Sequence, residues 1–225
     1  MINTTPRLLV RTMDAEMDKY IAEHISPEPP HLRELYRHTH LYNLYPRMCS
    51  GHHQGRILSM LSSMIKPKVA LELGTFTGYS ALCLAEGMES GTVLHTVELN
   101  DEMEDNLRAL FDTSPTGGTK IELHIGDAID VIPTLDVESM DLVYIDANKR
   151  HYVQYLEKLL PRLKAGSFII ADNTLWDGKV ANPGEHPDPQ TRGILDFNDM
   201  VAGHERLETV ILPLRDGLTL IRVKS

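Results

Sequence analysis

The chain has 225 residues, of which 42% are hydrophobic and 24% charged, and its formal net charge is −10 at pH 7. This composition is typical of a globular protein, and we expect a single domain over residues 1–225 with one well-buried core. The acidic total gives no general reason to bind nucleic acid or an anionic membrane, although it does not exclude a local basic patch. No apolar run approaches the roughly 18 residues of a membrane span, and the two cysteines are too few for a disulfide framework. We therefore expect no membrane partner and a cytoplasmic location.

The first 66 residues are predicted to form a helical cap. Apolar residues recur there at three- and four-residue spacing, and prolines separate the first run from the second. We expect helices over residues 5–25, 31–45 and 54–65. Because these helices precede the first clear strand, they should cover the core that residues 67–225 form.

From residue 67 onward, strand and helix signals alternate, which is the pattern of a parallel sheet with crossover helices. We expect strands over residues 69–73, 93–99, 121–125, 141–145 and 167–171. We expect helices over residues 79–86, 102–111, 152–163 and 191–202, and a proline-rich loop over residues 182–190. The last two strand-like runs, 207–214 and 218–223, flank the turn dipeptide Asp216-Gly217. The predicted fold is an α/β, doubly wound, seven-stranded sheet, mostly parallel, with an antiparallel C-terminal hairpin.

Two of the predicted strands stop at a carboxylate. Asp146 follows the strand that ends at residue 145, and Asp172 with Asn173 follows the next strand. Ligands of an open α/β sheet bind at the carboxyl ends of its strands, so these three side chains should meet at one rim. Three hard oxygen ligands beside Lys149 indicate a divalent-cation site coupled to proton transfer, with Mg²⁺ favoured and Mn²⁺ or Ca²⁺ as alternatives.

A glycine-containing turn follows the first predicted strand, in the segment Glu72-Leu-Gly-Thr-Phe-Thr-Gly-Tyr-Ser80. Its glycines do not have the G-x-G-x-x-G spacing of a dinucleotide turn. Glu72 would repel a phosphate and suits a cationic amino-acid group, with helix capping or loop bonding as the alternative. Glu98 closes the second strand, where a carboxylate can bind ribose hydroxyls, as in NAD and S-adenosylmethionine sites. Asp127 can cap the next helix, hold an adenine amino group, or do both.

As a set, these segments resemble the metal-dependent class I S-adenosylmethionine O-methyltransferases, the family of caffeoyl-CoA and catechol O-methyltransferases and many bacterial enzymes. The resemblance runs from about residue 48 to the C-terminus. Its pieces appear in order: Gly55, Glu72-Leu-Gly-Thr-Phe-Thr-Gly-Tyr-Ser80, Gly126-Asp-Ala128, Tyr144-Ile-Asp-Ala-Asn-Lys149, Asp172-Asn-Thr-Leu-Trp-Asp-Gly178 and Leu212-Pro-Leu-Arg-Asp-Gly217. The resemblance implies a Rossmann-like fold and, because family members are commonly dimers, a homodimer.

The resemblance also implies a role for each matching residue. Asp146, Asp172 and Asn173 would ligate the metal, and Asp146 would also border the cofactor and the reaction centre. Lys149 falls where the family has its general base. The residues placed around S-adenosyl-L-methionine are Ser50, Glu72, Gly74, Thr75, Ser80, Glu98, Asp127 and Ala128. In that pattern Glu72 faces the amino-acid portion of the cofactor and Glu98 its ribose.

Two positions depart from the family pattern. The family commonly has Asp-Ala-Asp-Lys at the first metal strand, where this chain has Asn148, so contacts assigned to that aspartate do not carry over. The plant pattern has Asn where this chain has Asp177, which leaves the metal ligands intact.

The predicted reaction is methyl transfer to a hydroxyl of a small catechol-like phenol. Such a hydroxyl has a pKa of about 9 to 10, so it needs a cation and a base to react at neutral pH. An alternative within the family is methylation of 5-hydroxyuridine in transfer RNA, which the acidic net charge and the pair Leu175-Trp176 disfavour without removing.

Other classes of function stay open as weaker alternatives. A nicotinamide oxidoreductase lacks its glycine fingerprint, and a non-catalytic binding module conflicts with the retained ligands. The histidines His38, His40, His52 and His53 indicate pocket-lining or surface roles rather than a zinc site, because no cysteine or fixed third ligand accompanies them.

Overall fold

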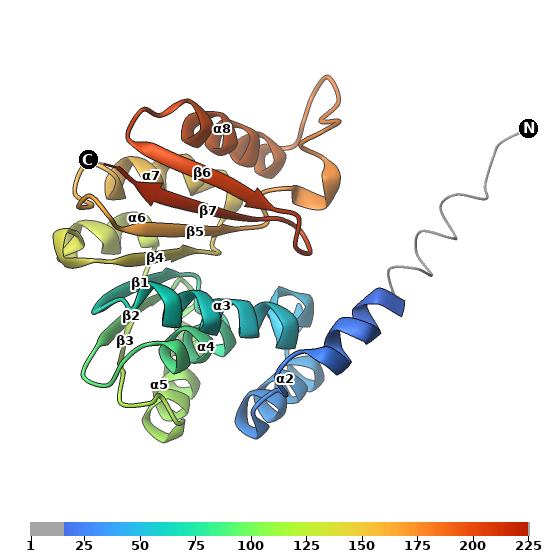
Figure 1. Cartoon of the computed structure of the whole chain (residues 1–225), viewed down its shortest axis with the longest axis vertical. Helices are drawn as coiled ribbons and strands as arrows, with labels where there is room; N and C mark the ends of the chain where they lie inside the picture. The colour runs from blue at the N-terminus through green and yellow to red at the C-terminus, as the bar shows by residue number, and fades with distance from the viewer. Residues whose placement is uncertain (1–15, 225) are drawn as a thin grey trace, which may run out of the picture.

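A seven-stranded sheet organises the structure, a computed structural model that describes residues 16–224 (Figure 1). Its strands, in the spatial order β3-β2-β1-β4-β5-β7-β6, are β1 (Val69–Leu73), β2 (Val93–Glu98), β3 (Lys120–Ile125), β4 (Leu142–Ile145), β5 (Phe168–Asp172), β6 (Leu207–Leu212) and β7 (Leu218–Val223). The first five are parallel, and β7 runs antiparallel to both of its neighbours. The predicted α/β, doubly wound fold with its antiparallel hairpin is therefore confirmed, with strand ends that shift by one or two residues.

Helices cover both faces of the sheet, as the right-handed crossovers of parallel strands require. Helices α2 (Pro30–Tyr42), α3 (Gly51–Ile65), α4 (Tyr79–Gly87) and α5 (Glu104–Thr113) belong to one side. Helices α6 (Ala128–Val131), α7 (Tyr152–Leu159) and α8 (Pro189–Gly203) belong to the other (Figure 1). Alternate residues of one strand enter different cores: Leu142 packs with residues of α4, and Val143 packs with residues of α7 and α8.

Several helix boundaries differ from the predicted ones for local reasons. The expected helix over residues 31–45 ends at Tyr42, because the residue before Pro46 is disfavoured in helical geometry, and Pro46–Met48 form a separate 3-10 turn. Helix α8 begins inside the expected loop, since the carboxylate of Asp188 accepts hydrogen bonds from the backbone of Gln190 and Thr191, each at 3.0 Å. No range was predicted for the four-residue helix α6, although Asp127 was considered as a cap, because the helix is too short to show a periodic pattern.

The N-terminal segment leads away from the sheet. Residues 16–24 are helical and precede α2 at one side of the molecule (Figure 1). Residues 5–15 of the helix expected over residues 5–25 lie outside the described residues. Within residues 16–224, no helix has both the length and the apolar character that crossing a bilayer requires.

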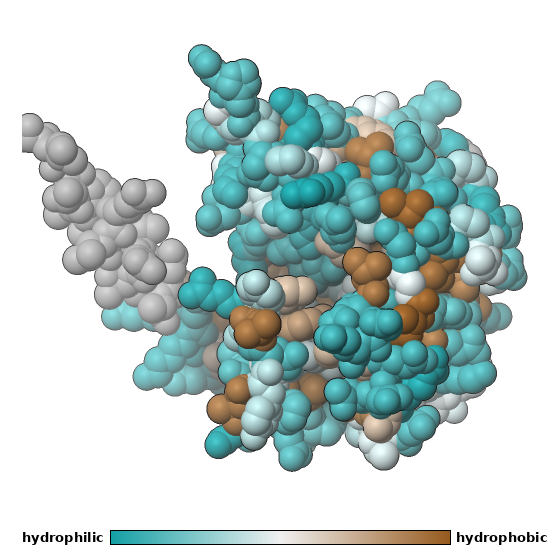
Figure 2. Space-filling model, turned by 180° about the vertical axis from the view of Figure 1, so that it is seen from behind, coloured by the Kyte–Doolittle hydropathy of each residue, from teal (hydrophilic) through white to brown (hydrophobic). Residues whose placement is uncertain are grey.

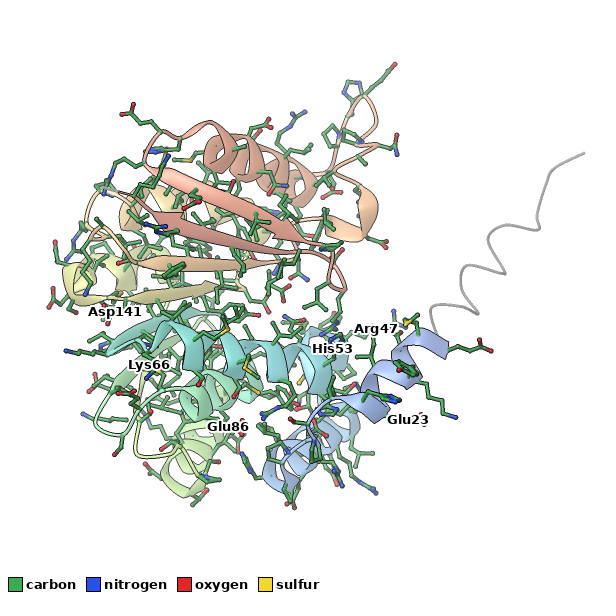
Figure 3. All side chains as sticks on the ribbon, viewed as in Figure 1. Glu23, Arg47, His53, Lys66, Glu86 and Asp141 are labelled. Atoms are coloured by element: carbon green, nitrogen blue, oxygen red, sulfur yellow. The ribbon has the colours of Figure 1, made fainter. Side chains whose placement is uncertain are left out.

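The two edges of the parallel strands have different chemistry. At the edge where these strands begin, Asp141 is labelled in Figure 3. Its side chain accepts a hydrogen bond from the backbone of Lys68 at 2.7 Å and pairs with Lys164 at 2.6 Å. The first contact joins the starts of β1 and β4, and the second joins the start of β4 to the segment that precedes β5. The opposite edge, where the strands end, carries the polar residues that were predicted to form a site.

Candidate active site

A cavity of about 970 Å³ opens at the carboxyl ends of the parallel strands. That volume lies in the range of small-molecule and cofactor sites. Figure 2 shows the molecule hollowed on the side from which the N-terminal segment leaves. The predicted site residues that line the cavity are Ser50, Gly74, Thr75, Ser80, Glu98, Asp127, Ala128, Asp146, Lys149, Asp172 and Asn173. Glu72, the remaining predicted residue, is fully buried at 0% exposure and does not line it.

Glu72 is a buried carboxylate with one unsatisfied oxygen. Its Oε2 accepts a hydrogen bond from the Thr96 hydroxyl at 2.5 Å, but its Oε1 has no partner among the described residues. Burial raises the pKa of Glu72 to about 8. A buried acceptor left unpaired is costly, so this position fits a ligand that brings a cationic donor, such as the amino group of an amino acid.

Gly74 sits where two strand ends approach each other closely. Its φ of +98° lies in the left-handed region that glycine tolerates, and a Cβ there would overlap the backbone carbonyl of Asp146. The amides of Gly74 and Thr75 both donate to the carbonyl of Val97, at 3.0 and 3.2 Å. The turn is therefore fixed between β2 and β4, and it holds Asp146 close to the segment 72–80.

Glu98 and Asp127 hold the neighbouring loops. Glu98 accepts hydrogen bonds from the backbone of Phe76 at 2.7 Å and of Asn100 at 2.9 Å. Asp127 caps α6 by accepting from the backbone of Ile129 at 2.9 Å, which is the capping role weighed from the sequence. Both side chains also line the cavity, so their loop contacts leave room for a second role toward a ligand.

Lys149 and Asp146 form an ion pair on the cavity wall. The distance from Lys149 Nζ to Asp146 Oδ1 is 2.6 Å, and the two side chains are only 11% and 17% exposed. A 3-10 turn, Lys149–His151, directs the lysine back toward the strand end, and the Asn148 side chain caps this turn by accepting from the backbone of Arg150 at 3.2 Å. Lys149 also lies 5.3 Å from the ring centre of Tyr152.

Asp172 is the most buried of the acidic groups that line the cavity. Its Oδ2 accepts from the side-chain amide of Gln54 at 2.6 Å and from the Tyr144 hydroxyl at 3.3 Å, and its Oδ1 accepts from the backbone N–H of Asn173 at 2.7 Å. Burial first, and then the negative charge of Asp146, raise the pKa of Asp172. Two facing carboxylates in a partly desolvated site repel each other, and a divalent cation would relieve that repulsion.

Asn173 completes the set of oxygen donors. Its φ is +59°, in the left-handed region where Asn is among the better tolerated residues. Two carboxylates, a carboxamide and ordered outer hydrogen bonds suit a hard divalent cation such as Mg²⁺. The residues present thus fit the cation that the sequence motif implies.

The sequence did not predict the role of Gln54, which donates a hydrogen bond to Asp172, or of Arg215, which donates one to Gln54. The Gln54 Oε1 accepts a hydrogen bond from Arg215 Nη1 at 2.9 Å, and the same nitrogen donates to the carbonyl of Ser50. Gln54 and Arg215 stand beside or within motifs recognised in the sequence. Their partnership with Asp172 depends on tertiary contact, however, and only adjacency to Gly55 could have drawn attention to Gln54.

Of the histidines considered earlier, none lines the cavity. His38 and His40 are exposed, and the Nε2 of His52 lies 2.8 Å from the carbonyl of Ser26. The surface interpretation therefore describes them better than the pocket-lining one. Trp176 does line the cavity, and its indole Nε1 is buried without a partner among the described residues.

Comparison with known proteins identifies the family. Residues 22–224 match the O-methyltransferase family. The chain is 35% identical over 208 residues to caffeoyl-CoA O-methyltransferase 1 of Zea mays. The aligned region covers 87% of this chain and 79% of the maize protein. It is 30% identical over 207 residues to caffeoyl-CoA O-methyltransferase of Petroselinum crispum, covering 87% of this chain and 84% of the parsley protein.

Solved structures agree with these relatives. The O-methyltransferase TomG of Streptomyces achromogenes, in complex with S-adenosylmethionine, has a TM-score of 0.84 and 27% identity and covers 93% of this chain and 96% of its own. The O-methyltransferase of Bacillus cereus, in complex with S-adenosylhomocysteine, has a TM-score of 0.83 and 28% identity, with coverages of 93% and 97%. The chain therefore belongs to the O-methyltransferase family, as a Rossmann-like, S-adenosylmethionine-dependent enzyme of the caffeoyl-CoA O-methyltransferase type.

Proposed function

We propose that this enzyme methylates a hydroxyl of a small catechol-like phenol, with a divalent cation held by Asp146, Asp172 and Asn173. The observation that carries the proposal is that the buried Asp172 and Asp146 stand at the ends of paired strands and line one cavity together with Lys149. The plant relatives support it, because a caffeoyl group carries two adjacent phenol hydroxyls that one cation can hold together.

The three oxygen ligands come from two adjacent strands. Asp146 directly follows β4, and Asp172 is the last residue of β5. These two strands pair directly in the sheet. When bound there, a divalent cation would supply Lewis-acid and template catalysis, lowering the pKa of a phenol and fixing its orientation. The hydrogen bonds from Gln54 and Tyr144 keep Asp172 in one orientation, which preserves the geometry of the site between turnovers.

Lys149 is the proposed general base. Its Nζ lies 2.6 Å from Asp146 Oδ1, so it borders the same oxygen cluster where the phenol is expected to bind. A neutral amine at this position would accept the phenol proton at Nζ. The low exposure of the lysine, 11%, limits competition from solvent water.

The cofactor is proposed to lie along the neighbouring strand ends. Glu72 would pair with the amino group of S-adenosylmethionine, Glu98 would bind its ribose and Asp127 its adenine. The unpaired Oε1 of Glu72 supports this orientation, since a buried carboxylate oxygen selects a cationic partner. Both reactants would then share one cavity, and proximity of this kind can lower a barrier by about 7 to 11 kcal/mol.

A homodimer is part of the proposal. Large apolar side chains are exposed at the end of α2 and in the segment that follows it, among them Tyr42 at 73% and Leu44 at 91%. Exposed apolar surface of this kind is typical of an interaction face.

The substrate class can be tested directly. The metal-stripped enzyme would be assayed with S-adenosylmethionine and either caffeic acid, caffeoyl-CoA or undermethylated transfer RNA, each with and without Mg²⁺. We expect cation-dependent methylation of a caffeoyl compound, and an Asp146→Ala variant should lose it. Activity on transfer RNA alone would support the alternative function, methylation of 5-hydroxyuridine in transfer RNA. Turnover in the metal-free enzyme equal to that with Mg²⁺ would overturn the role of the cation.

A further inference from the structure

A second group of potential metal ligands lies on the edge strands of the sheet. His95 is on β2, and Glu122 and His124 are on β3. The parallel register pairs His95 with Glu122 and Val97 with His124. Paired residues point to the same side of a sheet, and so do residues two apart on one strand. The three side chains therefore project from one face, side by side.

Their ligand atoms are close enough to share one ion. His95 Nδ1 lies 3.0 Å from His124 Nε2 and 3.3 Å from Glu122 Oε2, and all three atoms lie within 4.8 Å of one another. In a tetrahedral site with metal–ligand bonds of about 2.0 to 2.1 Å, neighbouring ligand atoms are about 3.3 Å apart. The two distances from His95 Nδ1 are close to that spacing, and the third, between Glu122 and His124, is within 4.8 Å. Within residues 16–224 this is the one cluster of His, Cys, Asp or Glu with such geometry.

The surroundings keep the three side chains in the protonation state that binds a metal ion. All three residues are half-buried, and burial lowers the pKa of both histidines, so their imidazoles present lone pairs at neutral pH. The other carboxylate oxygen of Glu122 accepts a hydrogen bond from Lys120 Nζ at 2.6 Å, an outer contact of the kind that orients a ligating carboxylate. The positive charge of Lys120 opposes a cation, but its side chain is 71% exposed and solvent screens it.

We propose that His95, Glu122 and His124 form a zinc site, distinct from the oxygen site of the cavity. Two imidazoles and one carboxylate are a zinc donor set, and a water molecule would fill the fourth position. None of the three residues lines the active-site cavity. An ion there would tie β2 to the edge strand β3, so its role is to stabilise this edge of the sheet.

The alternative is a hydrogen-bond network without a metal, in which one shared proton satisfies the three groups. To distinguish the zinc site from this network, Zn²⁺ alone is added to metal-stripped protein, and its binding is followed by calorimetry and by thermal unfolding. The test variant is His95→Gln with His124→Gln, and the matched control is His38→Gln with His40→Gln, an exposed pair on α2. Co²⁺ provides a second probe, because a tetrahedral nitrogen site absorbs visible light far more strongly than an octahedral oxygen site.

We expect the wild type and the control to bind one more Zn²⁺ per chain than the test variant. At about 100-fold excess over Kd the ion should raise Tm by about 5 °C or more, and the test variant should lose this rise. Methyl transfer with Mg²⁺ should be unchanged in the test variant. Equal zinc stoichiometry in wild type and test variant would overturn the proposal. If the double variant does not fold, Glu122→Gln serves instead, and an affinity for Zn²⁺ within about twofold of wild type would overturn it equally.

Discussion

Replacing Glu72 by Gln should stabilise the ligand-free protein and weaken cofactor binding at the same time. Glutamine keeps the shape of the side chain and an oxygen for the Thr96 hydroxyl, but it cannot ionise, so it carries no buried charge at any pH. In the wild type, burial raises the pKa of Glu72 from 4.5 to about 8. Below pH 4.5 the carboxyl is protonated in the folded and the unfolded state, so its contribution to folding stability is then at its maximum. This contribution falls as pH rises above 4.5 and is lost as pH passes through the folded pKa, because only the unfolded state releases the proton easily.

The magnitude follows from that difference in pKa. One pKa unit corresponds to about 1.4 kcal/mol, so the free energy of unfolding of the wild type, relative to the variant, should fall by roughly 3 kcal/mol between about pH 5 and pH 8. Urea unfolding of ligand-free protein, followed by circular dichroism, measures this difference. Glu102→Gln, on the exposed surface, is the matched control and should show no comparable trend.

Cofactor binding provides the second readout. A hydrogen bond to a charged group contributes about 1.5 to 3 kcal/mol, so the Kd for S-adenosylhomocysteine should rise by about 10- to 100-fold in the Glu72 variant. Isothermal calorimetry near neutral pH measures this value. The reasoning would be refuted by a stability difference that does not change with pH, or by unchanged affinity for S-adenosylhomocysteine.

Three further changes test other parts of the site. Lys149→Met should lower kcat by about 10²- to 10⁴-fold while leaving the Kd for S-adenosylhomocysteine unchanged, and a single-turnover assay beside calorimetry checks both. Gly74→Ala should lower the free energy of unfolding by about 2 kcal/mol or more, measured by urea unfolding, because its Cβ would overlap the carbonyl of Asp146. Gln54→Leu removes the amide that orients Asp172, and the Mg²⁺ concentration for half-maximal activity should rise by about 10- to 100-fold.

The sheet was predictable because its signals are local. Apolar, β-branched runs such as Leu142–Ile145 are buried on both faces, and they alternate with helical periodicity along the chain. The errors lie where tertiary contacts or prolines decide, as at Tyr42, where α2 stops before Pro46. Helix α6 is a single turn, and its start depends on one capping carboxylate, Asp127, that a sequence reader can interpret in several ways.

The convergence of the candidate site residues on one rim was predictable for a topological reason. Parallel strands end on one edge, so residues that follow β4 and β5 must converge whatever the details of packing. The histidine cluster could not be found in this way. His95 and His124 are 29 residues apart and meet only through the register of β2 and β3, which the sequence does not state. Residues that meet at the strand ends can thus be predicted from one sequence, whereas residues that meet across two strands can be predicted only if the register of those strands is known.

Asn148 shows how the structure resolves a departure from the family motif. The family commonly has an aspartate at this position, and either residue can cap a turn through its side-chain oxygen. Here Asn148 retains that function, because its Oδ1 accepts from the backbone of Arg150 and begins the turn that carries Lys149. The geometry between Lys149 and Asp146 therefore does not require the aspartate. What the substitution changes is the charge, since the cavity wall beside the lysine carries one carboxylate fewer than the motif would give it.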